Sequence, residues 1–232
     1  MTSSAELSPE LMLGEYLSSA NRFLALAREH GDDLGATAVP SCPAWRAKDL
    51  LAHVTGIAAH VTSGRDMGPD VQAWIDGEVA ARSGRTVGAI VAEWEDALPR
   101  LAAALRGQPV GGLVIDVVTH EHDLRGALGA ADHEQGLAAV LPALVDHVTE
   151  LAPLRDGRGV RLLGGTTVCT FGGPEIGLEA DVGDEWELFR LLACRRSAEE
   201  LEAYPRQGDV RLLFDLVSRY PLPERPLGER AR

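Results

Sequence analysis

The chain has 232 residues and a formal net charge of −13, which disfavours nucleic acid or an anionic membrane as a partner, because both require clustered Lys and Arg. Hydrophobic residues make up 45% and charged residues 25%, as in ordinary globular proteins, and no apolar run approaches the roughly 18–20 residues of a membrane-spanning helix. The amino-terminal residues predict no secretory signal, and three widely spaced cysteines without a CxxC pair favour the reducing cytoplasm over a disulfide framework.

Helices are predicted through the first two thirds of the chain. The first begins at Pro9 with Ser8 as its N-cap, carries apolar residues at helical spacing, and ends at Gly31. Helical patterns then recur over residues 46–63, 71–81, 86–105, 112–128 and 134–151. This succession predicts an up-down helix bundle over residues 1–153.

The pattern changes after Pro153. Short segments rich in strand-forming residues, separated by glycine-containing turns, cover residues 160–163, 168–171 and 176–182. Helical patterns return at residues 185–194, 198–204 and 209–220. We therefore expect a boundary near residues 153–157 and a small α+β domain over residues 157–222, in a protein that is mainly α.

Two predicted helices carry residues that could bind a metal ion. His53 lies on the apolar stripe of the helix over residues 46–63, and Asp116 and His120, four residues apart, share one face of the helix over residues 112–128. A carboxylate and a histidine on one helix, joined by a ligand from a neighbouring helix, would form a three-ligand metal site with an open position, as in catalytic sites. Each histidine taken singly is more often a hydrogen-bonded core or surface residue.

The run of polar residues from His120 to Asp123 cannot bind one ion as a unit, because adjacent side chains on a helix are turned by about 100°. His122 is predicted to face solvent or a domain contact. Asp123, three residues beyond His120, is predicted to orient that imidazole as a hydrogen-bond acceptor. The alternative for Asp123 is a surface salt bridge with Arg125 or Arg106.

Other candidates for chemistry are weaker. Cys42 is interpreted as a packed structural thiol rather than a nucleophile, because no nearby basic group obviously lowers its pKa. Arg195 and Arg196 close a predicted helix, where arginines commonly interact with the helix dipole, although one of them could instead hold a ligand carboxylate. The chain contains no GxSxG, P-loop or HExxH motif.

Three segments, in this order, resemble those of a known family. Residues 39–53 fit the pattern Cys-Pro-x-Trp-x3-Asp-Leu-x2-His, and residues 116–129 fit a metal-binding segment that ends in Asp-Leu-x-x-Ala-Leu-Gly. Residues 187–197 fit Glu-Leu-x-Arg-x3-Gly-Arg-x-Ser, with Cys194 in place of the Gly. Together they resemble the mycothiol-dependent maleylpyruvate isomerase family, whose helix bundle belongs to the DinB-like group.

The resemblance implies a DinB-like up-down four-helix bundle followed by a small α+β domain. It implies a divalent metal, with zinc expected, bound by His53, Asp116 and His120. Asp116 stands where the family has Glu, which is one methylene longer, so the helices must approach more closely or the coordination must loosen. Arg195 stands at the family's Gly-Arg position, which makes it the candidate catalytic residue that holds a substrate carboxylate.

The resemblance also implies an enzyme that uses a low-molecular-weight, mycothiol-like thiol and acts on a small electrophilic, carboxylate-bearing substrate. In this activity the thiolate adds to a conjugated double bond, the new single bond rotates, and elimination returns the trans isomer. A thiol S-transferase would need the same metal without the elimination. A non-catalytic protein that binds a metal or small ligand is a different class of alternative, and a bundle without a metal is a third.

Overall fold

The computed structural model describes residues 8–64, 68–130, 134–151, 154 and 157–229. The chain divides into two compact units, one made of residues 5–132 and the other made mainly of residues 133–232. The predicted boundary at residues 153–157 lies largely outside the described residues, and the division falls instead before helix α6 (Leu137–Leu151). This correction has a physical reason: α6 packs against α7 (Glu185–Leu192) and strand β2 (Thr167–Gly172), so its apolar face belongs to the carboxyl-terminal core.

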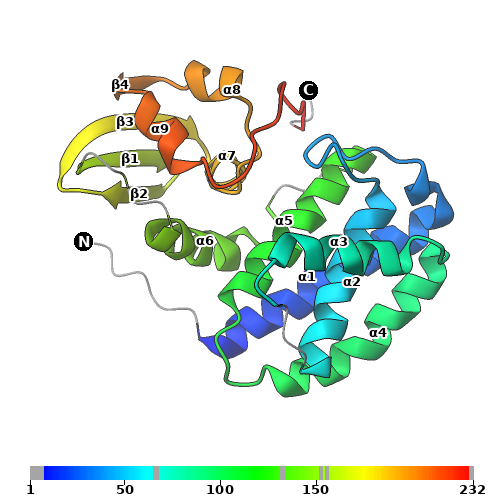
Figure 1. Cartoon of the computed structure of the whole chain (residues 1–232). Helices are drawn as coiled ribbons and strands as arrows, with labels where there is room; N and C mark the ends of the chain where they lie inside the picture. The colour runs from blue at the N-terminus through cyan, green and yellow to red at the C-terminus, as the bar shows by residue number, and fades with distance from the viewer. Residues whose placement is uncertain (1–7, 65–67, 131–133, 152–153, 155–156, 230–232) are drawn as a thin grey trace. The chain divides into compact units, whose positions relative to one another are not determined.

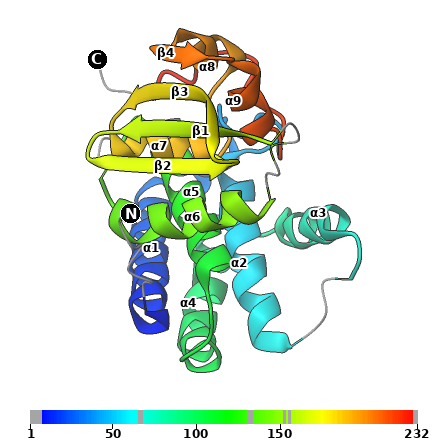
Figure 2. The ribbon, with the colours of Figure 1, turned by 90° about the vertical axis from the view of Figure 1, so that its left-hand side faces the viewer.

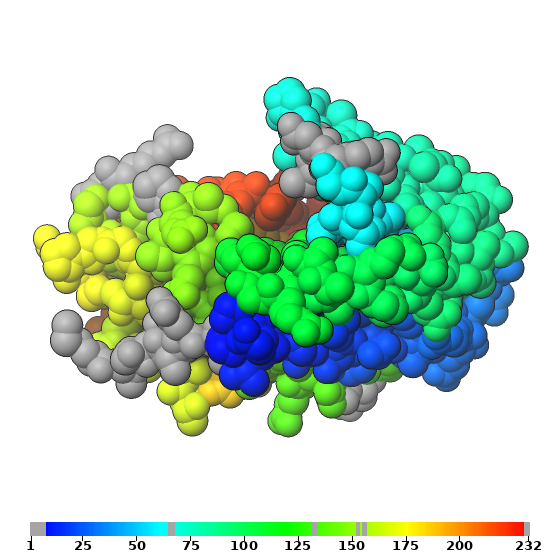
Figure 3. All heavy atoms as spheres, turned by 90° about the horizontal axis from the view of Figure 1, so that it is seen from below, coloured from blue at the N-terminus to red at the C-terminus, as the bar shows by residue number. Residues whose placement is uncertain are grey.

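The amino-terminal unit is a helix bundle (Figure 1). Its elements are α1 (Pro9–His30), the 3-10 helix η1 (Gly31–Gly35), α2 (Ala47–Ser63), α3 (Val71–Arg82), α4 (Val87–Ala104) and α5 (Gly111–Leu128). Helix α2 packs against α3, α4 and α5, while α1 packs against α4 and α5. The space-filling view shows α1, in blue, beside the green segments of α4 and α5 (Figure 3).

Local sequence explains where these helices begin and how they pack. The Ser8 side chain accepts a hydrogen bond from the Leu11 amide at 3.3 Å, which caps α1 in front of Pro9. In the core, the buried rings of Phe23 and Trp94 meet edge to face with centroids 5.5 Å apart. No described helix has both the length and the hydropathy required to cross a membrane.

The carboxyl-terminal unit is a small sheet with helices (Figure 2). Besides α6, β2 and α7, its elements are β1 (Arg158–Gly164), β3 (Glu175–Gly183), α8 (Ala198–Ala203), β4 (Arg206–Gly208) and α9 (Arg211–Leu216). The strand order is β2-β1-β3-β4, and β1 pairs antiparallel with β2 but parallel with β3. The sequence missed β4, which has only three residues, all exposed, so it shows no apolar alternation.

The mainly α fold with a helix bundle and a small α+β part is confirmed. The three predicted strands and the predicted helices of both units are present among the described residues, with bounds that shift by a few residues.

Candidate metal centre

The structure brings His53, Asp116 and His120 together inside the helix bundle. His53 extends from the middle of α2, and the other two extend from adjacent turns of α5. Asp116 Oδ1 lies 3.2 Å from His53 Nε2 and 3.6 Å from His120 Nε2. The two imidazole rings meet edge to face, with centroids 5.0 Å apart. The predicted pairing of Asp116 and His120 on one helix face is therefore present.

These three residues fit a divalent ion. In a tetrahedral site with bonds of about 2.1 Å, ligand atoms are separated by about 3.4 Å, close to the two distances from Asp116 Oδ1. One ligand-type atom from each of the three residues lies within 4.8 Å of the others. Both histidines are buried, whereas the Asp116 side chain keeps 28% of its surface exposed, so the cluster is not sealed from solvent. The shorter Asp side chain still reaches both histidines.

Asp123 contacts the second nitrogen of His120. Its Oδ2 lies 3.0 Å from His120 Nδ1, and Asp123 is only 1% exposed. A carboxylate at this position fixes the tautomer and orientation of a histidine whose other nitrogen binds a metal. The alternative of a surface salt bridge from Asp123 is wrong, because Asp123 is buried. Arg125 instead pairs with Glu121 at 2.8 Å.

The solvent-facing alternative for His122 is wrong, because His122 is only 3% exposed; the alternative of a domain contact stays a prediction. Its neighbour Glu121 is fully buried and accepts hydrogen bonds from Ser19 and Arg22 of α1, both at 2.8 Å. A solvent-facing His122 would require an exposed face at this point of α5. Residues 117–124 are all buried, so this part of the helix has none.

Two residues of the turn before α2, Cys42 and Trp45, contact the centre in ways that the sequence did not predict. The Trp45 ring lies 5.1 Å from the His53 ring and 5.9 Å from the His120 ring, between centroids. Cys42 Sγ lies 3.6 Å from Asp123 Oδ2. Both residues belong to the Cys-Pro-x-Trp pattern, which was the available signal, but an irregular turn has no periodicity from which side-chain directions follow.

Tyr16 is a further neighbour that sequence spacing could not have found. It lies on α1, 100 residues before Asp116, and is buried. Burial raises the pKa of Tyr16 above its ordinary value; the Trp94 side chain opposes this shift, and the negative charge of Asp116 adds a smaller contribution to it. The Tyr16 phenol therefore stays protonated at neutral pH.

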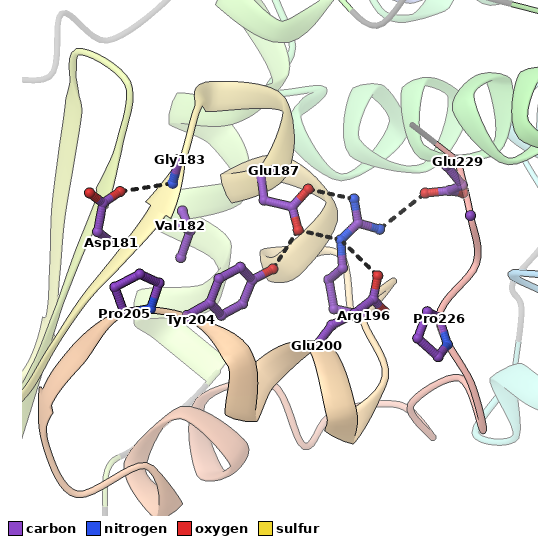
Figure 4. A pocket seen from close by; sticks show the side chains of 11 residues that line it. Asp181, Val182, Gly183, Glu187, Arg196, Glu200, Tyr204, Pro205, Pro226 and Glu229 are labelled. Atoms are coloured by element: carbon purple, nitrogen blue, oxygen red, sulfur yellow. Dashed lines mark hydrogen bonds and ion pairs between the residues drawn. The ribbon is translucent and has the colours of Figure 1, made fainter. Parts of the chain in front are cut away.

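A second cluster of charges lies in the carboxyl-terminal unit, beside a cavity of about 480 Å³ (Figure 4). The Arg196 guanidinium donates to both carboxylate oxygens of Glu187, at 2.6 and 2.9 Å, and to Glu229 at 3.0 Å. Tyr204 donates to the same Glu187 at 2.5 Å. Burial opposes the charge on Arg196, but the hydrogen bonds and charge of Glu187 outweigh it and hold the pKa of Arg196 above its usual value. This arrangement is a buried ion pair with an internal partner for each charge.

Arg195 is half-buried, and its Nη1 donates to the Ala193 carbonyl at 3.1 Å, at the carboxyl-terminal end of α7. This contact agrees with the interpretation that the arginine interacts with the helix end. Cys194, at the position of the motif glycine, has φ of +60°, so the left-handed backbone that favours glycine is kept here. The Cys194 thiol contacts the Val217 carbonyl at 3.2 Å.

Comparisons with known proteins bear on the family and the fold of this chain. A family model described as the mycothiol maleylpyruvate isomerase N-terminal domain matches residues 16–131. Crystal structures of a mycothiol-dependent maleylpyruvate isomerase and of a histidine-to-alanine mutant of it share the fold, each with a TM-score of 0.57, and cover 83% of this chain and 92% of their own. Sequence identity is 16% and 15%, respectively, so the likeness concerns the fold. No curated protein matches the chain.

Proposed function

Because the chain belongs to the mycothiol maleylpyruvate isomerase N-terminal domain family, we propose that it is a metal- and thiol-dependent enzyme of the maleylpyruvate isomerase type. The observation that carries the proposal is the approach of His53, Asp116 and His120 to one another within the region that the family model matches. The expected partners are zinc, mycothiol or a close analogue, and a small electrophile that bears a carboxylate. We also place the protein in the cytoplasm, where its three free thiols remain reduced.

In this proposal each residue of the centre has a separate task. The Nε2 atoms of His53 and His120 and Oδ1 of Asp116 would hold the ion. A bound divalent ion supplies charge that lowers the pKa of a thiol, which makes the thiolate nucleophile available at neutral pH. Asp123 would accept a hydrogen bond from Nδ1–H of His120, which leaves Nε2 unprotonated and free to bind the ion. Trp45 packs against both imidazoles and keeps water from that side of the rings.

A role in substrate binding is proposed for Arg195 of the carboxyl-terminal unit. Its planar guanidinium would hold the substrate carboxylate, and a bound thiol would supply the nucleophile for addition to the double bond. This role is a prediction. In the structure, Arg195 contacts the carboxyl-terminal end of α7.

The purified chain should carry close to one equivalent of zinc and should convert maleylpyruvate into its trans isomer only when mycothiol is added. Removing the metal with a chelator should abolish the conversion, and returning zinc should restore it, because the thiolate forms readily only beside a cation. Metal analysis measures the zinc content, and chromatography of substrate and products measures the isomerisation. A stable thiol adduct in place of the trans isomer would indicate the S-transferase. A protein that binds no metal would contradict the proposal.

Replacing Arg195 with lysine should lower kcat/KM at least about tenfold while the zinc content stays unchanged. The reason is that an ammonium is a point charge and cannot replace the two-pronged guanidinium that holds a carboxylate. Steady-state kinetics measures kcat/KM, and metal analysis of the same sample measures the zinc content. The matched control is Arg211→Lys in the same unit, because the Arg211 side chain is 84% exposed. Unchanged kinetics in Arg195→Lys would contradict a catalytic role for Arg195.

A further inference from the structure

A chain of hydrogen bonds leads from Cys42 to the metal centre. Asp123 Oδ2 lies 3.6 Å from Cys42 Sγ and 3.0 Å from His120 Nδ1, so one carboxylate oxygen accepts from both. The other nitrogen of His120 faces Asp116, at 3.6 Å. Cys42 is thus two contacts away from the nitrogen that would bind the ion.

The turn that holds Cys42 is fixed by backbone hydrogen bonds. The Cys42 amide donates to the Val39 carbonyl at 3.0 Å, and the Cys42 carbonyl accepts from the Trp45 amide at 2.8 Å. Helix α2 begins directly afterwards, where the Arg46 amide donates to Asp49 at 2.8 Å. One rigid turn therefore presents the Cys42 thiol to Asp123 and the Trp45 ring to both histidines.

We propose that Cys42 is a positioning residue of the metal centre, acting through Asp123 on His120. A buried carboxylate is stabilised by the donors that reach it, and losing one donor leaves its remaining hydrogen bonds less well aligned. Without the thiol, Asp123 would hold the His120 ring less firmly, and the affinity for the ion would fall. The inference rests on the proposed function, because it requires that His120 binds an ion.

An alternative is that Cys42, His120 and Asp123 bind an ion themselves, since one ligand-type atom from each lies within 4.8 Å of the others. Positioning is favoured because one imidazole faces both groups: His120 Nδ1 lies 3.0 Å from Asp123 Oδ2, a hydrogen-bond length, while its Nε2 lies 3.6 Å from Asp116 Oδ1. With both sites filled, His120 would also have to bind ions through both of its nitrogens.

The test compares the zinc affinity of four variants of the full chain by competition with a chromogenic chelator. Cys42→Ala should weaken binding by about 3–10-fold, and Cys42→Ser, which keeps a donor, should stay within about twofold of the wild type. Asp123→Ala should weaken binding by about 10–100-fold. The matched control is Cys169→Ala, because Cys169 is a buried cysteine of β2 in the other unit. Its zinc affinity should equal that of the wild type.

Cobalt substitution without added thiol provides a second readout. The wild type should show no thiolate-to-cobalt charge-transfer band, because Cys42 is not expected to be a ligand. A band that disappears in Cys42→Ala would overturn the inference, as would equal affinities of Cys42→Ala and the wild type, or equal losses in the Ala and Ser variants. A wild type that binds no zinc would instead overturn the proposed function itself, so the two failures are distinguishable.

Discussion

Replacing either His53 or His120 with alanine should lower the zinc affinity by at least about 100-fold, more than the 10–100-fold that follows the loss of a residue that only orients a ligand. Each histidine presents Nε2 toward Asp116, and a site left with one imidazole and one carboxylate has too few strong donors for tight binding. Metal analysis of the purified variants and competition with a chelator measure the loss. Thiol-dependent activity should fall with it.

The matched control is His60→Ala on the same helix. His60 is also buried, but its ring packs edge to face on Trp74, with centroids 4.8 Å apart, and it is not part of the cluster. This variant should keep its zinc affinity even if its melting temperature falls. Wild-type zinc content in both His53→Ala and His120→Ala would contradict the assigned ligands.

Replacing Glu187 with glutamine should destabilise the carboxyl-terminal unit by about 3 kcal/mol, because the change leaves the buried Arg196 without the charge of its bidentate partner. This is the low end of the range for breaking a buried pair, since Glu229 still contacts Arg196. Tyr204 would also lose a charged acceptor. Urea unfolding followed by circular dichroism measures the change in free energy.

An exposed ion pair of the same unit provides the control for this prediction. Arg211 pairs with Asp209 at 2.8 Å, but the Arg211 side chain is largely exposed, so Arg211→Gln should leave the unfolding midpoint close to that of the wild type. Equal midpoints for Glu187→Gln and the wild type would show that the buried pair adds nothing to stability.

The local features of this protein follow from short stretches of its sequence. Helix α1 begins at Pro9 and ends before Gly31, as expected, because caps and helical spacing act within a few residues of one another. Asp116 and His120 share a face of α5 for the same reason, since a helix repeats every 3.6 residues. The segments at residues 39–53 and 116–129 were also recognisable from the sequence, and the family model over residues 16–131 confirms the family they resemble.

Which sides of the helices are buried, and which elements they pack against, depends on tertiary contacts. The periodicity of α5 could not reveal that Glu121 and His122 are inside, because their burial depends on elements distant in the sequence. The contacts of Cys42 and Trp45 with the centre depend on an irregular turn, whose side-chain directions no repeat specifies. Likewise, α6 packs with the carboxyl-terminal unit, although its sequence pattern predicts one more helix of the bundle. The reason is that an apolar stripe requires a partner surface but does not specify which surface that is.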